Sequence, residues 1–163
     1  MIAIQIEKTG PFMKQLLVGS LFDAFLVSSA EVTTYASFRI DGTLHPDFYQ
    51  KEEADAIRKA SDRLARWKQI RPFVTSVISG DRQPLLLKVV LQVPAGQAEE
   101  MLAKSGISCT PEDLYGLFLN IQFRDGALTL TTGCSVRLFT AEHEVGKMWD
   151  QSMQKFLEKY ELI

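Results

Sequence analysis

The dipeptide Asp125-Gly126 lies between two runs of alternating apolar and polar residues, and it constrains the fold more than any other stretch. A two-residue type I′ turn needs positive φ at both central positions, which Asp-Gly tolerates, so residues 115–124 and 127–139 are predicted to form a β-hairpin. This turn places Arg124 opposite Ala127 and Phe123 opposite Leu128. Because side chains alternate between the faces of a strand, the remaining pairs follow from these two.

The predicted hairpin has one apolar face and one polar face. The apolar pairs are Ile121–Leu130, Leu119–Thr132, Leu117–Cys134 and Tyr115–Val136. The other face pairs Gln122 with Thr129, Asn120 with Thr131, Phe118 with Gly133, and Gly116 with Ser135. We expect Phe118 to lie over the bare backbone of Gly133. A slip of one residue would expose the whole apolar set, so the apolar face is expected to cover the core.

A second segment, TTYASFRI at 33–40, matches TTGCSVRL at 131–138 in its two threonines, its serine and its arginine. Interpreted as a strand, its inward residues are Val32, Thr34, Ala36, Phe38 and Ile40. The shared polar residues then fall on an open sheet face, where Lys88, Gln92 and Arg124 are further candidates. Such residues suit the wet face of an antiparallel sheet, and they also suit a shallow binding face. The candidate binding residues are Thr33, Tyr35, Ser37, Arg39, Phe118, Asn120, Gln122, Thr129, Thr131 and Arg137.

Hydrophobic periodicity predicts the other elements. They are a strand at 2–6, a short helix after Pro11 that stops near Gly19, two strands or one bent strand within 25–40 before a turn at Asp41-Gly42, a strand at 85–93, a helix at 94–106 and a helix at 144–160. The last helix is expected to turn Val145, Met148, Trp149, Phe156 and Tyr160 inward.

Between them, residues 51–79 are predicted to form a broken or paired helix. Ile57, Ala60, Leu64 and Trp67 recur at helical spacing, and Arg71-Pro72 is the expected break because proline lacks an amide donor.

This order predicts an α+β fold, with a largely antiparallel sheet built from two related β-α-β-β-(α) units and helices packed on one face. We expect a single domain over 1–163, with possible repeat halves at 1–80 and 81–163.

Composition narrows the function classes. The chain has a net charge of −2, 46% hydrophobic residues and 23% charged residues, which is typical of a compact soluble protein. A net charge of −2 produces no positive electrostatic potential over the whole protein that would attract nucleic acid or an anionic membrane, so neither is an expected partner. The first ten residues alternate in polarity and are expected to form a strand and not a signal peptide, and the apolar runs are too short for a membrane span, so a cytoplasmic protein is expected. Cys109 and Cys134 have no metal-binding spacing; reduced thiols are expected, with a disulfide or a catalytic thiol as alternatives.

Few residues point to catalysis, and we expect no catalytic residue, metal or cofactor. One alternative is a small enzyme with a site near His45 and Asp47, since the loop 41–47 could gather Asp41, His45 and Asp47 around a metal or a general base. The other interpretation of His45 is a loop residue before proline. Glu142-His143-Glu144 cannot face one ion, because consecutive helical residues diverge by about 100 degrees.

A second alternative is a nucleic-acid binder that uses the sheet face and a basic helix at 58–71. The run RKASDRLARWKQIR holds six basic residues, Arg58, Lys59, Arg63, Arg66, Lys68 and Arg71, and one acid. Acidic residues begin the predicted helix and basic residues end it, so complementarity to the helix macrodipole explains the pattern as well.

The segments FRIDGTLHPDFY, WKQIRPF and YGLFLNIQFRDGALTLTTG, with the Trp149 helix, resemble a family of small single-domain bacterial proteins of unknown function. The resemblance covers most of the chain. It implies one domain in the bacterial cytosol and assigns no catalytic residue, cofactor or partner. The leading hypothesis is therefore a non-enzymatic binding or scaffold protein that uses the open polar sheet face for a protein partner or a second copy of the chain.

Overall fold

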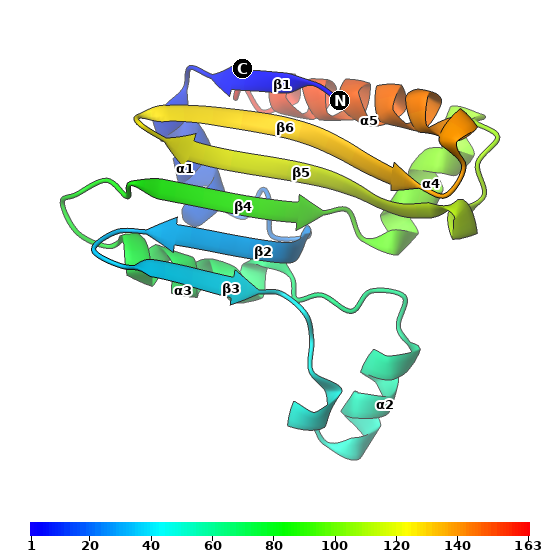
Figure 1. Ribbon diagram of the computed structural model, residues 1–163, viewed down its shortest axis with the longest axis horizontal. Coiled ribbons are helices and arrows are strands. Elements are labelled where there is room, and N and C mark those ends of the chain that lie inside the picture. Colours follow the sequence, from blue (N-terminus) through cyan, green and yellow to red (C-terminus); the bar gives the residue numbers. More distant parts are fainter.

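The computed structural model describes residues 1–163 as an α+β fold, as predicted, with five α-helices and one six-stranded antiparallel sheet in the order β1-β6-β5-β4-β2-β3 (Figure 1). The strands are β1 (Ala3–Ile6), β2 (Leu26–Thr33), β3 (Ser37–Asp41), β4 (Leu86–Gln92), β5 (Leu114–Arg124) and β6 (Ala127–Val136). The helices are α1 (Thr9–Leu17), α2 (Lys51–Lys59), α3 (Trp67–Ile78), α4 (Ala95–Ser105) and α5 (Phe139–Lys159), with short 3-10 turns η1 (Pro46–Phe48) and η2 (Pro111–Asp113).

The hairpin β5–β6 forms in the predicted register. Asp125 and Gly126 both have positive φ, 53° and 76°, which confirms the tight turn. The pairs from Arg124–Ala127 through Leu117–Cys134 and Gly116–Ser135 follow the expected order. A β-bulge between Leu114 and Gly116 then shifts the register, and Val136 pairs with Leu114. The predicted Tyr115–Val136 pair is therefore wrong, because the bulge adds a residue to β5.

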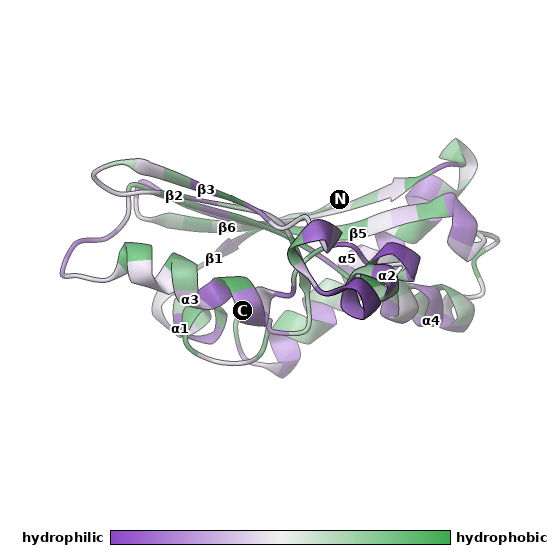
Figure 2. Cartoon of the chain, turned by 90° about the horizontal axis from the view of Figure 1, so that it is seen from below, coloured by the Kyte–Doolittle hydropathy of each residue, from purple (hydrophilic) through white to green (hydrophobic).

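The helices cover one face of the sheet and leave the other bare (Figure 2). A cluster of 27 buried residues lies between the sheet and the helices, and it draws on both halves of the chain. Both tryptophans are buried in it with their indole N–H groups satisfied: Trp67 donates to the Leu16 carbonyl at 2.7 Å and Trp149 to the Phe118 carbonyl at 2.8 Å. Along α5 the predicted inward residues are at least partly buried, except Tyr160, which is 44% exposed and corrects that expectation.

The helical segment at 51–79 is divided as predicted, but the break lies elsewhere. Residues 60–66 are non-helical between α2 and α3, while Pro72 lies inside α3 with its ring exposed. Tertiary hydrogen bonds explain this. Ala65 donates its N–H to the Gly42 carbonyl at 2.7 Å, and its own carbonyl accepts from Val27 at 2.8 Å. These backbone bonds hold the segment against β2 and replace helical bonds.

The segment 33–40 is not one strand. Thr34, Tyr35 and Ala36 form the turn between β2 and β3, and Thr34 donates its N–H to the Ala36 carbonyl at 2.9 Å. Tyr35 and Ala36 are exposed at the turn, so the inward placement of Ala36 is wrong. The turn residues Thr34, Tyr35 and Ala36 are not typical turn formers. Because the polar and apolar residues alternate on both sides of them, the sequence gives no sign that the chain reverses direction here.

The internal repeat is not confirmed. Both halves run strand, helix and two strands in the same order, followed by α2 and α3 in the first half and by α5 alone in the second. In the second half, however, β4 pairs with β5, whereas in the first half β1 pairs with β6 at the opposite edge from β2 and β3. Equivalent elements therefore have different neighbours.

Residues 43–64, which contain η1 and α2, project from the sheet after β3 and are called the arm below (Figure 1). Ala54 is the one buried residue of the arm. A β-bridge between Thr43 and Leu64 closes its base. None of the helices combines the length and the apolar character needed to cross a membrane.

Candidate functional site

The strand registers define the bare side of the sheet, called the open face. From β1 to β3 its main side chains are Gln5, Thr129, Thr131, Ser135, Phe118, Asn120, Gln122, Arg124, Lys88, Val90, Gln92, Ser29, Glu31, Thr33, Ser37, Arg39 and Asp41. No helix covers this side of the sheet in Figure 2. Most of these side chains are polar, as expected for the solvated side of an antiparallel sheet.

The structure brings most of the candidate residues together on this face. Those on it are Thr33, Ser37, Arg39, Phe118, Asn120, Gln122, Thr129 and Thr131. Tyr35 lies instead at the turn between β2 and β3, 93% exposed. Arg137 follows the end of β6. Its side-chain Nε lies 3.3 Å from Asp113 Oδ1, and its backbone N–H donates to the Asp113 carbonyl. These two residues therefore lie outside the open face.

One row of side chains crosses the whole sheet. In the paired registers, Arg39 lies opposite Glu31, Glu31 opposite Lys88, Lys88 opposite Gln122, Gln122 opposite Thr129 and Thr129 opposite Gln5. We call these six residues the polar row. Its charges alternate at the β3 end, where Arg39 lies 3.5 Å from Glu31. Strand alternation predicts on which face of the sheet each side chain lies. Glu31 and Gln5 were not among the candidates predicted from the sequence, because the strand order that aligns them with the other four residues is not visible in the sequence.

Phe118 adds an aromatic surface to the open face, four residues along β5 from Gln122 of the polar row. Its ring lies over Gly116: a Cβ added there would lie 2.6 Å from the Phe118 Cζ atom, while one at Gly133 would meet only the Phe118 Cβ, at 3.9 Å. The expectation that Phe118 covers Gly133 is therefore corrected, because the ring turns along its own strand. The glycine lets the ring lie flat on the sheet.

The open face carries a shallow depression rather than a deep pocket. Its volume is about 580 Å³, and its charged lining residues are Glu31, Arg39, Asp41 and Lys88. A surface of this shape offers hydrogen-bonding groups and charges of both signs over a wide area. It lacks the enclosed apolar walls typical of small-molecule sites.

The loop around His45 does not gather its three candidate side chains. Asp41 Oδ1 accepts the Thr43 N–H at 2.8 Å, and hydrogen bonds from Thr43 hold the pKa of Asp41 below its usual value. Asp47 Oδ1 accepts from Arg58 at 3.0 Å and is 95% exposed. Nowhere in the chain do three His, Cys, Asp or Glu side chains lie close enough to hold a metal ion.

The basic run at 58–71 is not one helix. It is divided among the end of α2, the non-helical segment 60–66 and the start of α3. Several of its arginines hold the chain together: Arg71 forms a two-pronged pair with Asp23 at 3.0 Å, and Arg66 donates to the Ala24 carbonyl at 2.9 Å. The predicted continuous basic helix is therefore wrong.

Both cysteines are free, which leaves no disulfide. Burial raises the pKa of the Cys134 thiol, and the neighbouring Glu142 raises it further. Burial likewise raises the pKa of the Cys109 thiol. Both thiols therefore stay protonated at neutral pH, which opposes a role as nucleophiles.

Fold and surface together define an α+β protein with a six-stranded antiparallel sheet that is covered by helices on one side and open on the other. The chain belongs to the Family of unknown function (DUF5721), whose model matches residues 15–163. This confirms the resemblance drawn from the sequence. Comparisons with curated proteins and with solved structures found no match.

Proposed function

We propose that this chain is a non-catalytic binding or scaffold protein and that its open face receives a protein partner. The polar row carries the proposal, because it places hydrogen-bonding and charged side chains across every strand of the sheet without a helix over them. Opposite charges alternate from Arg39 to Lys88, and a partner with the complementary pattern would be selected by charge and register.

The dimensions suit a protein partner. Six strands about 4.8 Å apart make a face roughly 25–30 Å wide, and strands of 4 to 11 residues make it roughly 25 Å long on average. That area approaches the roughly 800 Å² per partner that a standard protein interface buries. Phe118 and Val90 supply apolar contacts between the polar groups. A small molecule would find little enclosure on such a surface.

The location and the domain organisation are part of this proposal. The family resemblance supports a bacterial cytoplasmic protein, and one continuous core supports a single domain over residues 1–163. No comparable observation supports either alternative, a small enzyme with a site near His45 and Asp47 or a nucleic-acid binder. No three side chains near His45 and Asp47 lie close enough to hold a metal ion, and the basic run does not form one helix.

Site-specific photocrosslinking in the producing cells tests the proposal. We place a benzophenone amino acid at Gln122, which is exposed at the centre of the polar row, and in a matched variant at Gln154, which is exposed on α5. We expect one discrete crosslinked protein from position 122 and none from 154. Equal products from both positions, or no product from 122, would contradict a partner on the open face.

Binding of the identified protein then provides a second test. Lys88→Glu reverses a charge in the polar row, and Lys155→Glu makes the same change on α5; both lysines are exposed. We expect Lys88→Glu to weaken the measured affinity at least about tenfold, which is a typical effect of reversing an interfacial charge. Lys155→Glu should leave it unchanged. Equal affinity for both variants would move the partner away from this face.

A further inference from the structure

The outer edge of β3 has unpaired backbone groups. β3 is the last strand of the sheet and pairs on one side only, with β2. Thr34 donates its N–H to Ala36 and Gly42 donates to Ser28 across this pair. Because hydrogen-bonded positions alternate along an antiparallel ladder, the even-numbered residues of β3 face β2. The N–H and C=O groups of Ser37, Arg39 and Asp41 therefore point outward, as on any free strand edge.

We propose that β3 pairs antiparallel with β3 of a second copy of the chain, so that two sheets join into one. The side-chain charges select the partner and the register. Arg39 and Asp41 lie two residues apart on the open face. A two-fold axis at Ile40 places Arg39 opposite the partner's Asp41 and Asp41 opposite the partner's Arg39. A register centred on Arg39 would instead place two arginines opposite each other, which is unfavourable.

The backbone fits the same register. Arg39 and Asp41 are the residues whose N–H and C=O groups point outward, so each opposed pair can exchange two backbone hydrogen bonds. Arg39 is 81% exposed and already lies 3.5 Å from Glu31, so in the pair its guanidinium would lie between two carboxylates. Hydrogen bonds from Thr43 lower the pKa of Asp41 and so favour its charged form.

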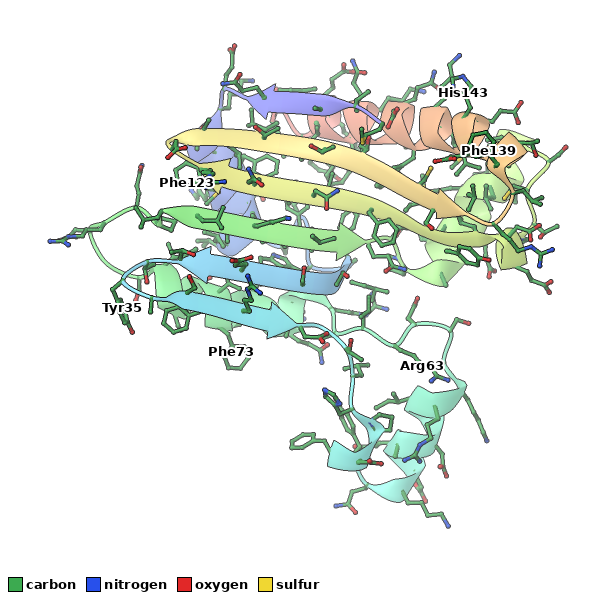
Figure 3. All side chains as sticks on the ribbon, in the orientation of Figure 1. Tyr35, Arg63, Phe73, Phe123, Phe139 and His143 are labelled. Carbon is green, nitrogen blue, oxygen red and sulfur yellow. The ribbon has the colours of Figure 1, made fainter.

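Exposed aromatic side chains lie beside this edge. Figure 3 shows Tyr35 at the start of β3 and Phe73 of α3 next to the strand. Their exposed fractions are 93% and 64%, which are high for such large side chains. On the helix side of the sheet, Ile40 would meet the partner's Ile40 at the two-fold axis. A second copy would therefore cover apolar surface as well as backbone groups.

The paired molecule has one twelve-stranded sheet with two open faces side by side, since each copy contributes six strands. Self-association through β3 does not depend on a partner at the open face, because it uses the edge of the sheet and not its face. Partner crosslinking from Gln122 and self-association through β3 can each fail separately.

A charge-exchange experiment tests the register. We compare wild type, Arg39→Asp, Asp41→Arg and the double variant by sedimentation velocity over a concentration series that reaches the millimolar range. Each single variant sets like charges opposite each other twice and should associate at least about tenfold more weakly. The double variant restores opposite charges and should dimerise again. A mixture of the two single variants should form a heterodimer, since their charges are complementary.

Arg124→Asp is the matched control, since Arg124 is also an exposed arginine of the open face but lies on β5. It should dimerise as wild type does. Melting curves of all variants show whether each is folded. A wild type that stays monomeric throughout the series would overturn the proposal. Unchanged dimerisation of both single variants would place the contact elsewhere and overturn it too.

Disulfide trapping gives an independent readout. Ile40 is predicted to face its own copy in a non-hydrogen-bonded pair, with Cα atoms about 4.5 Å apart, which a disulfide can span. We therefore expect I40C to crosslink on mild oxidation, while S37C, opposite the partner's Thr43, should not. Wild type, with Cys109 and Cys134, is oxidised in parallel. Faster crosslinking of S37C than of I40C would exclude this register.

Discussion

Gly42 marks the point at which the chain leaves the sheet for the arm. A Cβ added there would lie 1.7 Å from the Val27 carbonyl oxygen, so no side chain fits without a backbone shift. The Gly42 carbonyl also accepts the Ala65 N–H at 2.7 Å. One glycine therefore holds β2, the end of β3 and the segment before α3 together.

We predict that Gly42→Ala lowers the free energy of unfolding by more than about 3 kcal/mol, beyond the usual range for point mutations. The melting temperature should fall by about 6 °C or more. Gly10→Ala is the control, because nothing lies within 4 Å of its added Cβ and α1 favours alanine over glycine. Thermal melts decide the comparison. Similar melting temperatures for the two variants would contradict the close approach at Gly42.

At the scale of elements, the arm differs from the rest of the molecule. α2 has nine residues, fewer than the roughly 12–15 that an isolated helix needs, and Ala54 is its only buried residue. The charges at its ends stabilise α2, because Glu52 and Glu53 lie in the first turn and the basic residues Arg58 and Lys59 in the last. The packing of β5 is much denser, since Leu117, Leu119 and Ile121 are fully buried.

We therefore predict that amide hydrogens in α2 exchange at least about a hundredfold faster than those of Leu119 and Ile121 in β5, because local opening of α2 exposes little apolar surface. Hydrogen exchange followed by mass spectrometry measures both segments in one sample. Equal protection in dilute solution would show that α2 has stabilising contacts beyond its own chain. Protection of the arm that grows with protein concentration would place it near the dimer contact.

For the whole molecule, one core that joins both halves predicts one cooperative unfolding transition. Trp67 belongs to the first half and Trp149 to the second, and both are buried. Trp149→Phe leaves Trp67 as the sole fluorescent reporter, and Trp67→Phe leaves Trp149. In each variant, the urea midpoint by fluorescence should equal the midpoint by far-UV circular dichroism. Separate midpoints would show that residues 1–80 and 81–163 unfold as independent units.

The sequence determined those features that depend on neighbouring residues. Asp125-Gly126 fixed the β5–β6 turn and most of its register, because only a few residue pairs accept positive φ twice. Alternation fixed which side chains of the hairpin face the helices from Leu117 to Cys134, but Tyr115, at the bulge, is 58% exposed and not inward as predicted. The proline and glycine signals placed α1 and α4 within a few residues of their observed bounds.

Only the tertiary structure decided where the helical segment is interrupted between α2 and α3. Residues 60–66 have helical periodicity in sequence, but Ala65 accepts a backbone hydrogen bond from Val27 and donates one to Gly42, and these bonds to distant parts of the chain hold the segment out of a helix. The polar row likewise needs the strand order, which brings Gln5 and Arg39 to opposite ends of one line. A short sequence pattern reflects the interactions between residues that are close in the chain. The strand order and the break before α3 arise instead from contacts between distant segments, and no short stretch of sequence encodes those contacts.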